Sequence, residues 1–323
     1  MKTNKFLIGF LLQAVVCSGG LHAQTDLHAN AYSIIQDAVT DIVCTSPTDA
    51  IQKEKRVIQI LDGKGKGDAS FVCMCDRFSS LKKFSGEVRD ASGNVIRKIK
   101  KSELKVTEYS DELVSDDYYY FFEYTPSRYP ITITYEWEIK NSDGLIGYPS
   151  FLPQKNYNQS VAQASYRILT PADNPCRYRT INMQAEVSQQ QTADGNWLTE
   201  VKVQSLPAIQ KEPYSPALSE LLPRIYFTPR NFSFEGTKGS MDNWQTYGAW
   251  QYQLLNGRDQ IPPALKEELQ RRTANCNTPY EKIAAVYQYL ASTTRYVSIQ
   301  LGIGGLQPIA ATDVHRTGFG DCK

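Results

Sequence analysis

The sequence predicts an α+β protein, in which an N-terminal antiparallel β-sandwich is followed by a smaller, mainly helical region. Two observations support this expectation. Between residues 57 and 203, short apolar or alternating runs are separated by turn residues, and after about residue 240 the apolar residues recur at helical spacing. A chain of 323 residues is long enough for two domains that each bury a core. We therefore expect two domains.

The first expected strands lie at residues 57–61 and in a hairpin at residues 84–99. The run VIQIL at 57–61 ends in GKGKGD, which has the composition of a turn rather than the spacing of a phosphate-binding loop. In the hairpin, Phe84, Gly86 and Val88 alternate with polar residues, and DASGN at 90–94 supplies the turn. Both segments are typical of antiparallel sheets.

Two stronger strand signals follow at residues 118–124 and 131–139. The first, YYYFFEY, is nearly all aromatic, and the second, ITITYEWEI, alternates with a period of two, so that one face must be buried. The aromatic run could form a core or a platform on which sugars stack. We favour the core, because dense aromatic residues at strand spacing more often pack inside a protein.

The remaining strands of the sandwich are expected at residues 165–169, 183–187 and 197–203, with a turn at 192–195. We assign residues 24–210 to this domain. Prolines then recur at positions 207, 213, 216, 223 and 229, which disfavours regular structure and predicts a linker over residues 211–240.

Three helices are expected after the linker. Trp244, Tyr247, Gln251 and Leu254 share one face of the first, and Gly257 is placed to end it.

The second and third helices carry clearer start signals. Pro262 and Pro263 open the second, which carries Leu265 and Leu269. The third begins with TPYE at 278–281, a capping box with proline at the first helical position. Its apolar stripe, which we expect to belong to the core rather than to a cofactor site, consists of Ile283, Val286, Tyr287 and Leu290.

The N-terminus has the pattern of a secretion signal over residues 1–23. Lys2 and Lys5 precede an apolar stretch at 6–17 that is too short for a convincing membrane span, and small residues lead to Ala23. We favour cleavage after Ala23 over lipid attachment at Cys17. We therefore expect a periplasmic or secreted protein, with possible association with the cell envelope.

Without that leader the chain carries 33 basic and 34 acidic residues, so its net charge is close to zero. This balance and the lack of a basic stripe argue against a nucleic-acid partner. Six cysteines remain: Cys44, Cys73, Cys75, Cys176, Cys276 and Cys322. Cys73 and Cys75 lie two apart on an expected strand, where they share one face; we favour structural burial over a metal site there. We expect no metal and no cofactor.

The C-terminal stretch 296–323 carries most of the functional information. Cys322 closes a glycine-rich turn and follows Asp321, and a thiol at the first turn of a helix is favoured as thiolate by unpaired amides and the helix dipole. The motif residues are Arg295, Tyr296, Val297, Leu301, Gly302, Gln307, Pro308, Val314, Gly320, Asp321, Cys322 and Lys323. Their order and spacing resemble the start of the transglutaminase-like superfamily core.

This resemblance implies that residues 241–323 are the first, helical part of a transglutaminase-like, papain-like core. In the superfamily the cysteine of a Gly-Asp-Cys segment opens the core helix and is the nucleophile, which points to Cys322 as the catalytic residue. The family's histidine and aspartate would lie after Lys323, so we expect the chain as given to be inactive. Residues 57–203, together with EPYSP at 212–216 and LPR at 222–224, resemble the domain of unknown function that commonly precedes such cores in secreted bacterial proteins.

Other residues near Cys322 have more ordinary interpretations. His315 could act as a base only if the intervening loop folded back, and Tyr296 could donate to an oxyanion, although we favour burial. We expect Asp321 to serve a helix N-terminus, Gly318 and Gly320 to be required by the shape of the turn, and the Cys322 amide to contribute to an oxyanion hole. His28 is expected at the surface.

Two function classes compete. In the first, the protein is a thiol-dependent peptidase, amidase or acyl transferase that acts on a protein or peptide amide, such as that of glutamine, through a cysteine thioester. In the second, it is a non-catalytic binding or structural module with a degenerate core that holds a peptide or glycan. The sequence leaves the natural substrate and the oligomeric state open.

Overall fold

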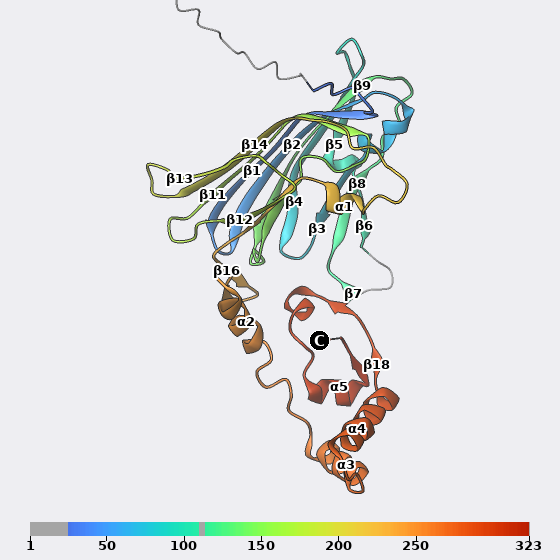
Figure 1. The fold of residues 1–323 in the computed structure, drawn as a ribbon, viewed down its shortest axis with the longest axis vertical. Helices are drawn as coiled ribbons and strands as arrows, with labels where there is room; N and C mark the ends of the chain where they lie inside the picture. Colours follow the sequence, from blue (N-terminus) through green and yellow to red (C-terminus); the bar gives the residue numbers. More distant parts are fainter. Residues whose placement is uncertain (1–24, 110–113, 323) are drawn as a thin grey trace, which may run out of the picture.

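A computed structural model describes residues 25–109 and 114–322, and the expected leader at 1–23 lies outside them. In this part of the chain a large β-structure occupies one end of the molecule and small helices occupy the other (Figure 1). The α+β class is confirmed. None of the helices described is long and apolar enough to cross a membrane.

The largest sheet of the described chain has eight strands. In spatial order they are β13 (Val187–Gln191), β14 (Trp197–Leu206), β11 (Gln159–Thr170), β1 (Ser33–Ser46), β2 (Asp49–Ile60), β9 (Ile131–Ser142), β4 (Ser79–Arg89) and β5 (Val95–Lys100). The neighbours β1 and β11 run parallel, whereas the other neighbours run antiparallel. The expectation of a purely antiparallel sandwich was therefore wrong, because β1 and β11 run parallel.

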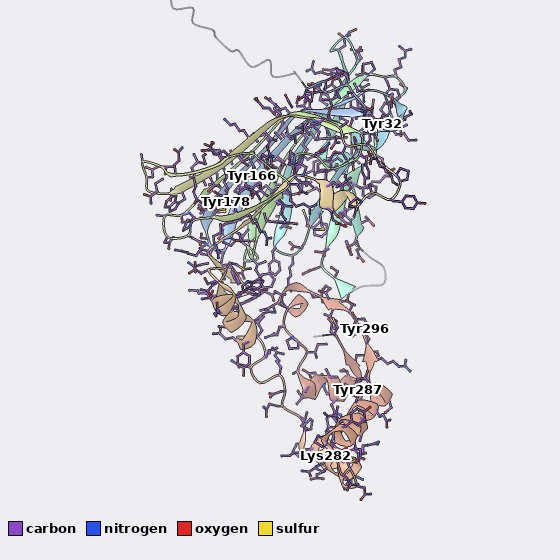
Figure 2. All side chains as sticks on the ribbon, in the orientation of Figure 1. Tyr32, Tyr166, Tyr178, Lys282, Tyr287 and Tyr296 are labelled. Carbon is purple, nitrogen blue, oxygen red and sulfur yellow. The ribbon has the colours of Figure 1, made fainter. Side chains whose placement is uncertain are left out.

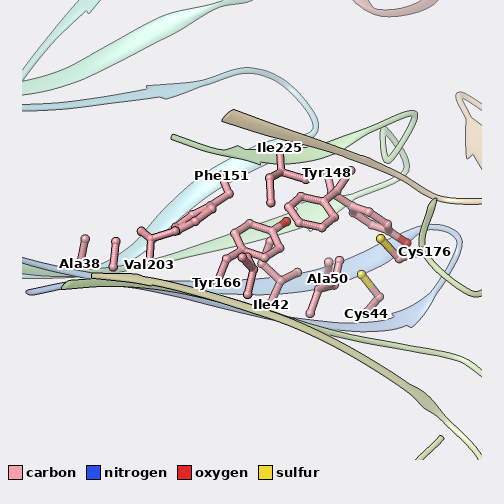
Figure 3. Packing of buried hydrophobic residues seen from close by; sticks show 14 of the residues in the cluster. Ala38, Ile42, Cys44, Ala50, Tyr148, Phe151, Tyr166, Cys176, Val203 and Ile225 are labelled. Carbon is pink, nitrogen blue, oxygen red and sulfur yellow. The ribbon is translucent and has the colours of Figure 1, made fainter. Parts of the chain in front are cut away.

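Two three-stranded sheets pack against this large sheet. One contains β10 (Tyr148–Phe151), β15 (Arg224–Thr228) and β12 (Arg177–Ile181), and the other contains β3 (Phe71–Cys75), β8 (Tyr118–Phe122) and β6 (Lys105–Glu108). Each closes a separate hydrophobic core. In the first core, shown in Figure 3, the ring of Tyr166 on β11 stacks on Phe227 of β15 with centroids 4.3 Å apart. The sandwich thus joins one wide sheet to two narrow ones.

The middle of strand β2 separates the two cores with polar side chains. Glu54 is buried there and accepts hydrogen bonds from Thr40 Oγ1 and Gln52 Nε2, each at 2.9 Å. Arg56 Nη2 lies 3.7 Å from the same carboxylate. Because a buried charge is costly unless it is paired and hydrogen-bonded, this cluster stabilises the fold only as long as its members remain together.

The predicted strands and their burial agree with the structure at most positions. The hairpin around 90–94 joins β4 to β5, and Ile131, Ile133 and Tyr135 of β9 face the second core. The aromatic run forms β8, of which Tyr118, Tyr120 and Phe122 pack on that core as expected, although all five side chains of the strand are only half-buried. The sequence GKGKGD forms a short 3₁₀ helix, η1 (Gly63–Ala69), rather than a simple turn.

Three expectations about the sandwich were wrong. Strands β1, β6, β10 and β12 were missed. Residues 183–186 lie outside any strand, because β13 begins only at Val187 and consists largely of exposed glutamines on the sheet edge. The proline-rich range 211–240 contains a short helix and three strands: α1 (Leu218–Leu221), β15, β16 (Asn231–Phe234) and β17 (Thr237–Ser240). Pro223 and Pro229 flank β15 rather than interrupt it, and Ile225 and Phe227 are buried.

A third, smaller core lies where the sandwich meets the helical end. It consists of buried Phe232, Phe234, Trp250 and Leu254, with Phe78 of the sandwich packed against Phe234 at a centroid distance of 5.0 Å. Trp250 and Leu254 belong to helix α2 (Trp244–Gln253) and its C-terminal cap. Trp244, expected on the buried face, is 85% exposed.

The remaining elements form the helical end of the molecule. They are α3 (Pro263–Thr273), α4 (Pro279–Thr293), β18 (Arg295–Tyr296), β19 (Ile299–Gln300), η3 (Gly302–Gly305), α5 (Ala311–Thr317) and β20 (Phe319–Gly320). Helix α4 begins at the predicted capping box, in which Thr278 and Glu281 exchange hydrogen bonds. Its apolar stripe, however, is exposed to solvent.

Candidate functional site

Helix α5 and strand β20 set the path of the chain into Cys322. Gly318 ends α5 with a φ of +73°, a left-handed conformation that disfavours side chains, and its N–H donates to Val314 O at 2.9 Å. Strand β20 then pairs in parallel with β18, and Val297 N donates to Gly320 O at 2.9 Å. The predicted requirement for glycine at 318 is therefore confirmed.

Gly320 has no comparable requirement. A Cβ atom there would lie 3.4 Å from a methyl group of Val314, which is ordinary van der Waals contact, and its φ is not positive. The expectation that the turn demands glycine at 320 was wrong for this arrangement, because the residue lies in an extended strand.

Asp321 fixes the backbone on both sides of the turn. Its Oδ2 atom accepts a hydrogen bond from Ile299 N at 2.9 Å, and its Oδ1 atom accepts one from Cys322 N at 2.7 Å. We had expected this carboxylate at a helix N-terminus and the Cys322 amide in an oxyanion hole. Both expectations concern a helix after Cys322, which lies outside the described residues, so they stay predictions. In the described chain the carboxylate joins β19 to the end of β20, and the Cys322 amide donates a hydrogen bond to it.

Cys322 itself is exposed and follows strand β20. The helix that the resemblance predicts after it would lie outside the described residues. Four other cysteines, namely Cys44, Cys73, Cys75 and Cys176, are buried, and Cys276 is half-buried. Burial raises the pKa of Cys44 to about 11 and that of Cys176 to about 12, which suppresses their thiolates. Among the six described thiols, Cys322 is thus the one that solvent reaches most freely.

A cavity of about 1100 Å³ lies beside this turn, between α3, α4, α5 and strands β18 and β20. Its wall includes Gly320 and Asp321 but is mostly apolar. The apolar side chains on it include Leu265, Leu269, Val286, Tyr287, Leu290, Tyr296, Pro308, Ile309 and Val314.

The expectation that the stripe of Ile283, Val286, Tyr287 and Leu290 belongs to a core was wrong, and so was the expected burial of Tyr296, because all five side chains are exposed. Tyr287 is 68% and Tyr296 67% exposed, and Figure 2 places both at the helical end, far from Tyr166 in the sandwich. Their apolar character was visible in the sequence, but their position around an open cavity was not.

The two described histidines do not complete a catalytic pair with Cys322. His315 lies in the last turn of α5, exposed on the cavity wall, and within residues 25–109 and 114–322 no hydrogen bond joins it to Cys322. His28 is exposed near the start of the sandwich, as expected. A base for Cys322 is therefore not supplied by either imidazole in this arrangement.

The predicted burial of Cys73 and Cys75 is confirmed, since both face the second core from strand β3. Within the described ranges, no group of three or more His, Cys, Asp or Glu residues is arranged to hold a metal ion.

Comparison with known families bears on the sandwich. Residues 50–210 match the model of DUF3857, a domain of unknown function with a solved structure. The chain contains a DUF3857 domain. The match covers the large sheet from β2 onward and ends shortly after β14. No curated protein matches the chain.

Among solved structures, the chain resembles a "putative protease" from Parabacteroides distasonis, with a TM-score of 0.63 and 13% identity. The likeness covers 90% of this chain and 56% of the other, so this chain spans little more than half of that protein. At this identity the likeness concerns the fold, and it extends beyond the DUF3857 domain into the helical end.

Two further likenesses are weaker. An M1 zinc metallopeptidase from Deinococcus radiodurans matches with a TM-score of 0.29 and 9% identity, over 61% of this chain and 42% of that one. A "putative nutrient binding protein" from Legionella pneumophila matches with a TM-score of 0.29 and 8% identity, over 80% of this chain and 94% of that one.

Proposed function

We propose that this chain carries the nucleophile of a transglutaminase-like thiol enzyme and that the nucleophile is Cys322. The observation that carries the proposal is the presentation of an exposed thiol at the end of a braced Gly-Asp turn, beside a large apolar cavity. The likeness in fold to a protein named as a protease is compatible with this proposal. The ordered motif from Arg295 to Lys323 supports it further.

The proposed chemistry is acyl transfer through a thioester. The thiolate of Cys322 attacks the carbonyl carbon of a peptide or glutamine amide, the C–N bond breaks, and the amine leaves with a proton. Water or a second amine then takes the acyl group and regenerates the thiol. A general base is required for both steps, and we propose that it comes from chain following Lys323. Under this proposal, residues 241–323 form only the first part of the catalytic core.

The apolar cavity fits a peptide or protein substrate better than a small polar one. Its wall presents aromatic and aliphatic groups from α3, α4 and α5, and its polar groups include Asp321, His315, Arg295, Arg258 and Asp259. Pockets of this composition bind ligands by burying apolar surface, and a few polar groups fix the orientation. Together with the expected leader, this leads us to propose action on proteins or peptides in the periplasm or outside the cell.

The test is thioester formation in a protein that contains this chain and the sequence that follows it in the same reading frame. Incubation with a glutamine-containing peptide ester should add the acyl mass to the peptide that bears Cys322, and hydroxylamine should remove it. Cys322→Ala should abolish the adduct, whereas Cys276→Ala should retain it. An adduct that survives in Cys322→Ala would contradict the assignment.

The alternative is a non-catalytic module that binds a peptide in the same cavity. The feature that favours it is the engaged state of the Cys322 amide, which donates to Asp321 rather than into an open oxyanion site. In that case Cys322→Ala should bind the peptide with unchanged affinity, and no thioester should form in the unaltered protein.

A further inference from the structure

The turn that carries Cys322 is tied to the sandwich through strand β19. On one side, Ile299 donates its N–H to Asp321 Oδ2, which also braces the Cys322 amide through Oδ1. On the other side, β19 pairs in parallel with β7 (Val114–Ser115), which belongs to the N-terminal half of the chain. One two-residue strand therefore contacts both the thiol-bearing turn and the sandwich end of the molecule.

The loop after β19 is held by a charged cluster on the sandwich side. Arg77 Nη1 lies 2.9 Å from Glu235 Oε1, and Arg77 Nε lies 3.6 Å from Asp116 Oδ2. Each carboxylate also accepts a backbone hydrogen bond from the loop: Gly302 N donates to Asp116 Oδ2 at 3.1 Å, and Ile303 N donates to Glu235 Oε2 at 2.9 Å. Such charge-assisted bonds to backbone amides are stronger than exposed ion pairs alone.

Gly302 is the residue that permits this contact. Its φ is +49°, and a Cβ atom built there would lie 2.5 Å from Glu235 Oε1 and 2.8 Å from Arg77 Nη1. Both distances are well inside van der Waals contact, so any side chain would displace the charged cluster or the loop. Gly304, two residues later, provides a matched comparison. A Cβ atom there would meet only a methyl group of Ile299 at 3.9 Å, and its φ is not positive.

We infer that Arg77 and Asp116 of the sandwich, together with Glu235 of the β16–β17 turn, anchor the 301–303 loop and β19, and that β19 through Asp321 positions the turn bearing Cys322. Asp321 is thus a positioning residue, and the DUF3857 domain is part of the scaffold of the thiol site rather than a separate appendage. The anchoring depends only on contacts within this chain. Its catalytic consequence rests on the function proposed above.

The test compares Gly302→Ala with Gly304→Ala in the 323-residue chain. Hydrogen exchange should report the Ile299 and Cys322 amides, and iodoacetamide labelling should report the Cys322 thiol, with Cys276 as an internal reference. We expect Gly302→Ala to speed exchange at Ile299 by about tenfold or more and to change the Cys322 labelling rate relative to Cys276. Gly304→Ala should leave both readouts within about twofold of the unaltered chain. Equal behaviour of the two variants would overturn the inference.

A second series keeps the test decisive if Gly302→Ala does not fold. Asp321→Ala removes both acceptors, whereas Asp321→Asn keeps one carbonyl oxygen and should restore part of the protection at Ile299 or Cys322. Glu235→Gln should speed hydrogen exchange at the Ile303 amide and, through β19, at the Ile299 amide. The unfolding temperature of the sandwich should stay unchanged. Unaltered exchange at Ile299 in Asp321→Ala and Glu235→Gln would also overturn the inference.

These measurements test the anchoring of β19 and the proposed enzymatic function separately. If the exchange pattern responds as expected but the longer protein forms no thioester at Cys322, the anchor stands and the proposed function fails. If a thioester forms although Gly302→Ala and Gly304→Ala exchange alike, the function stands and the anchor fails.

Discussion

The two ends of this molecule handle their apolar side chains differently. In the sandwich, the large sheet meets two smaller sheets, and residues such as Tyr166, Ile168, Ile133 and Phe227 are almost fully buried. At the helical end, α3 buries Leu265 and α4 buries no side chain, although α4 carries an apolar stripe. Apolar periodicity therefore predicts which face of an element is apolar. Whether other residues of this chain bury that face has to be seen in the structure.

The largest effect should come from opening the first core. Phe227→Ala removes a ring that stacks on Tyr166 across the two sheets, and we expect it to lower the free energy of unfolding by about 3 to 5 kcal/mol. The matched control is Tyr226→Ala on the same strand, because Tyr226 faces outward and is 41% exposed. Denaturant titration followed by circular dichroism measures both, and similar losses in the two variants would contradict the described packing.

A slightly smaller effect should follow from breaking the polar cluster between the cores. Glu54→Ala leaves Arg56 without its carboxylate in a largely buried position, and we expect a loss of about 3 kcal/mol. Glu136→Ala changes an exposed carboxylate of neighbouring strand β9 and should cost less than about 0.5 kcal/mol. Equal denaturation midpoints for the two variants would show that the cluster does not divide the cores as described.

The stability of the sandwich should also fall at high pH. Burial raises the pKa of Cys44 from 9.0 to about 11, so this thiol stabilises the folded state below pH 9, and that contribution is lost as the pH rises through 11. A shift of this size corresponds to about 2 to 3 kcal/mol. Between pH 9 and 11, Cys44→Ala should therefore lose less stability than the unaltered chain. Cys276→Ala should lose as much as the unaltered chain, and the reverse order would contradict burial of Cys44.

The smallest effect should come from the helical end. Tyr287→Ser alters an exposed ring on the cavity wall, and we expect a change in the free energy of unfolding of less than about 0.5 kcal/mol. The same substitution should weaken binding of an apolar peptide to the cavity, measured by calorimetry. A loss of several kcal/mol in stability would mean that α4 is covered in solution, and the contrast between the two ends would disappear.

Much of the fold could be predicted from particular residues. Alternation in 131–139 predicts a strand with one buried face, and the Thr278 to Glu281 capping box predicts the start of α4. Strand β1 was missed because its buried positions Ala38, Thr40, Ile42 and Cys44 include small and polar side chains, which weaken the periodic signal. The parallel pairing of β1 with β11 depends on which strands meet, and local sequence does not encode that.

The sequence predicted the residue types of the candidate site but not the contacts that these residues make. Gly318 and Cys322 could be singled out, because a left-handed turn and a lone exposed thiol follow from local sequence. The partners of Asp321 could not, since Ile299 lies 22 residues away and is brought near only by the pairing of β18 with β20. The sequence also did not predict the cluster of Arg77, Asp116 and Glu235, because these residues meet only in the folded chain.

The most direct test of the account is labelling of the native chain with iodoacetamide near neutral pH, followed by peptide mapping of the six thiols that the structure describes. We predict that Cys322 is labelled first, that Cys276 follows, and that Cys44, Cys73, Cys75 and Cys176 are labelled only after unfolding. Protection of Cys322 to the level of the buried thiols would contradict the claim that this turn presents a reactive thiol at the surface.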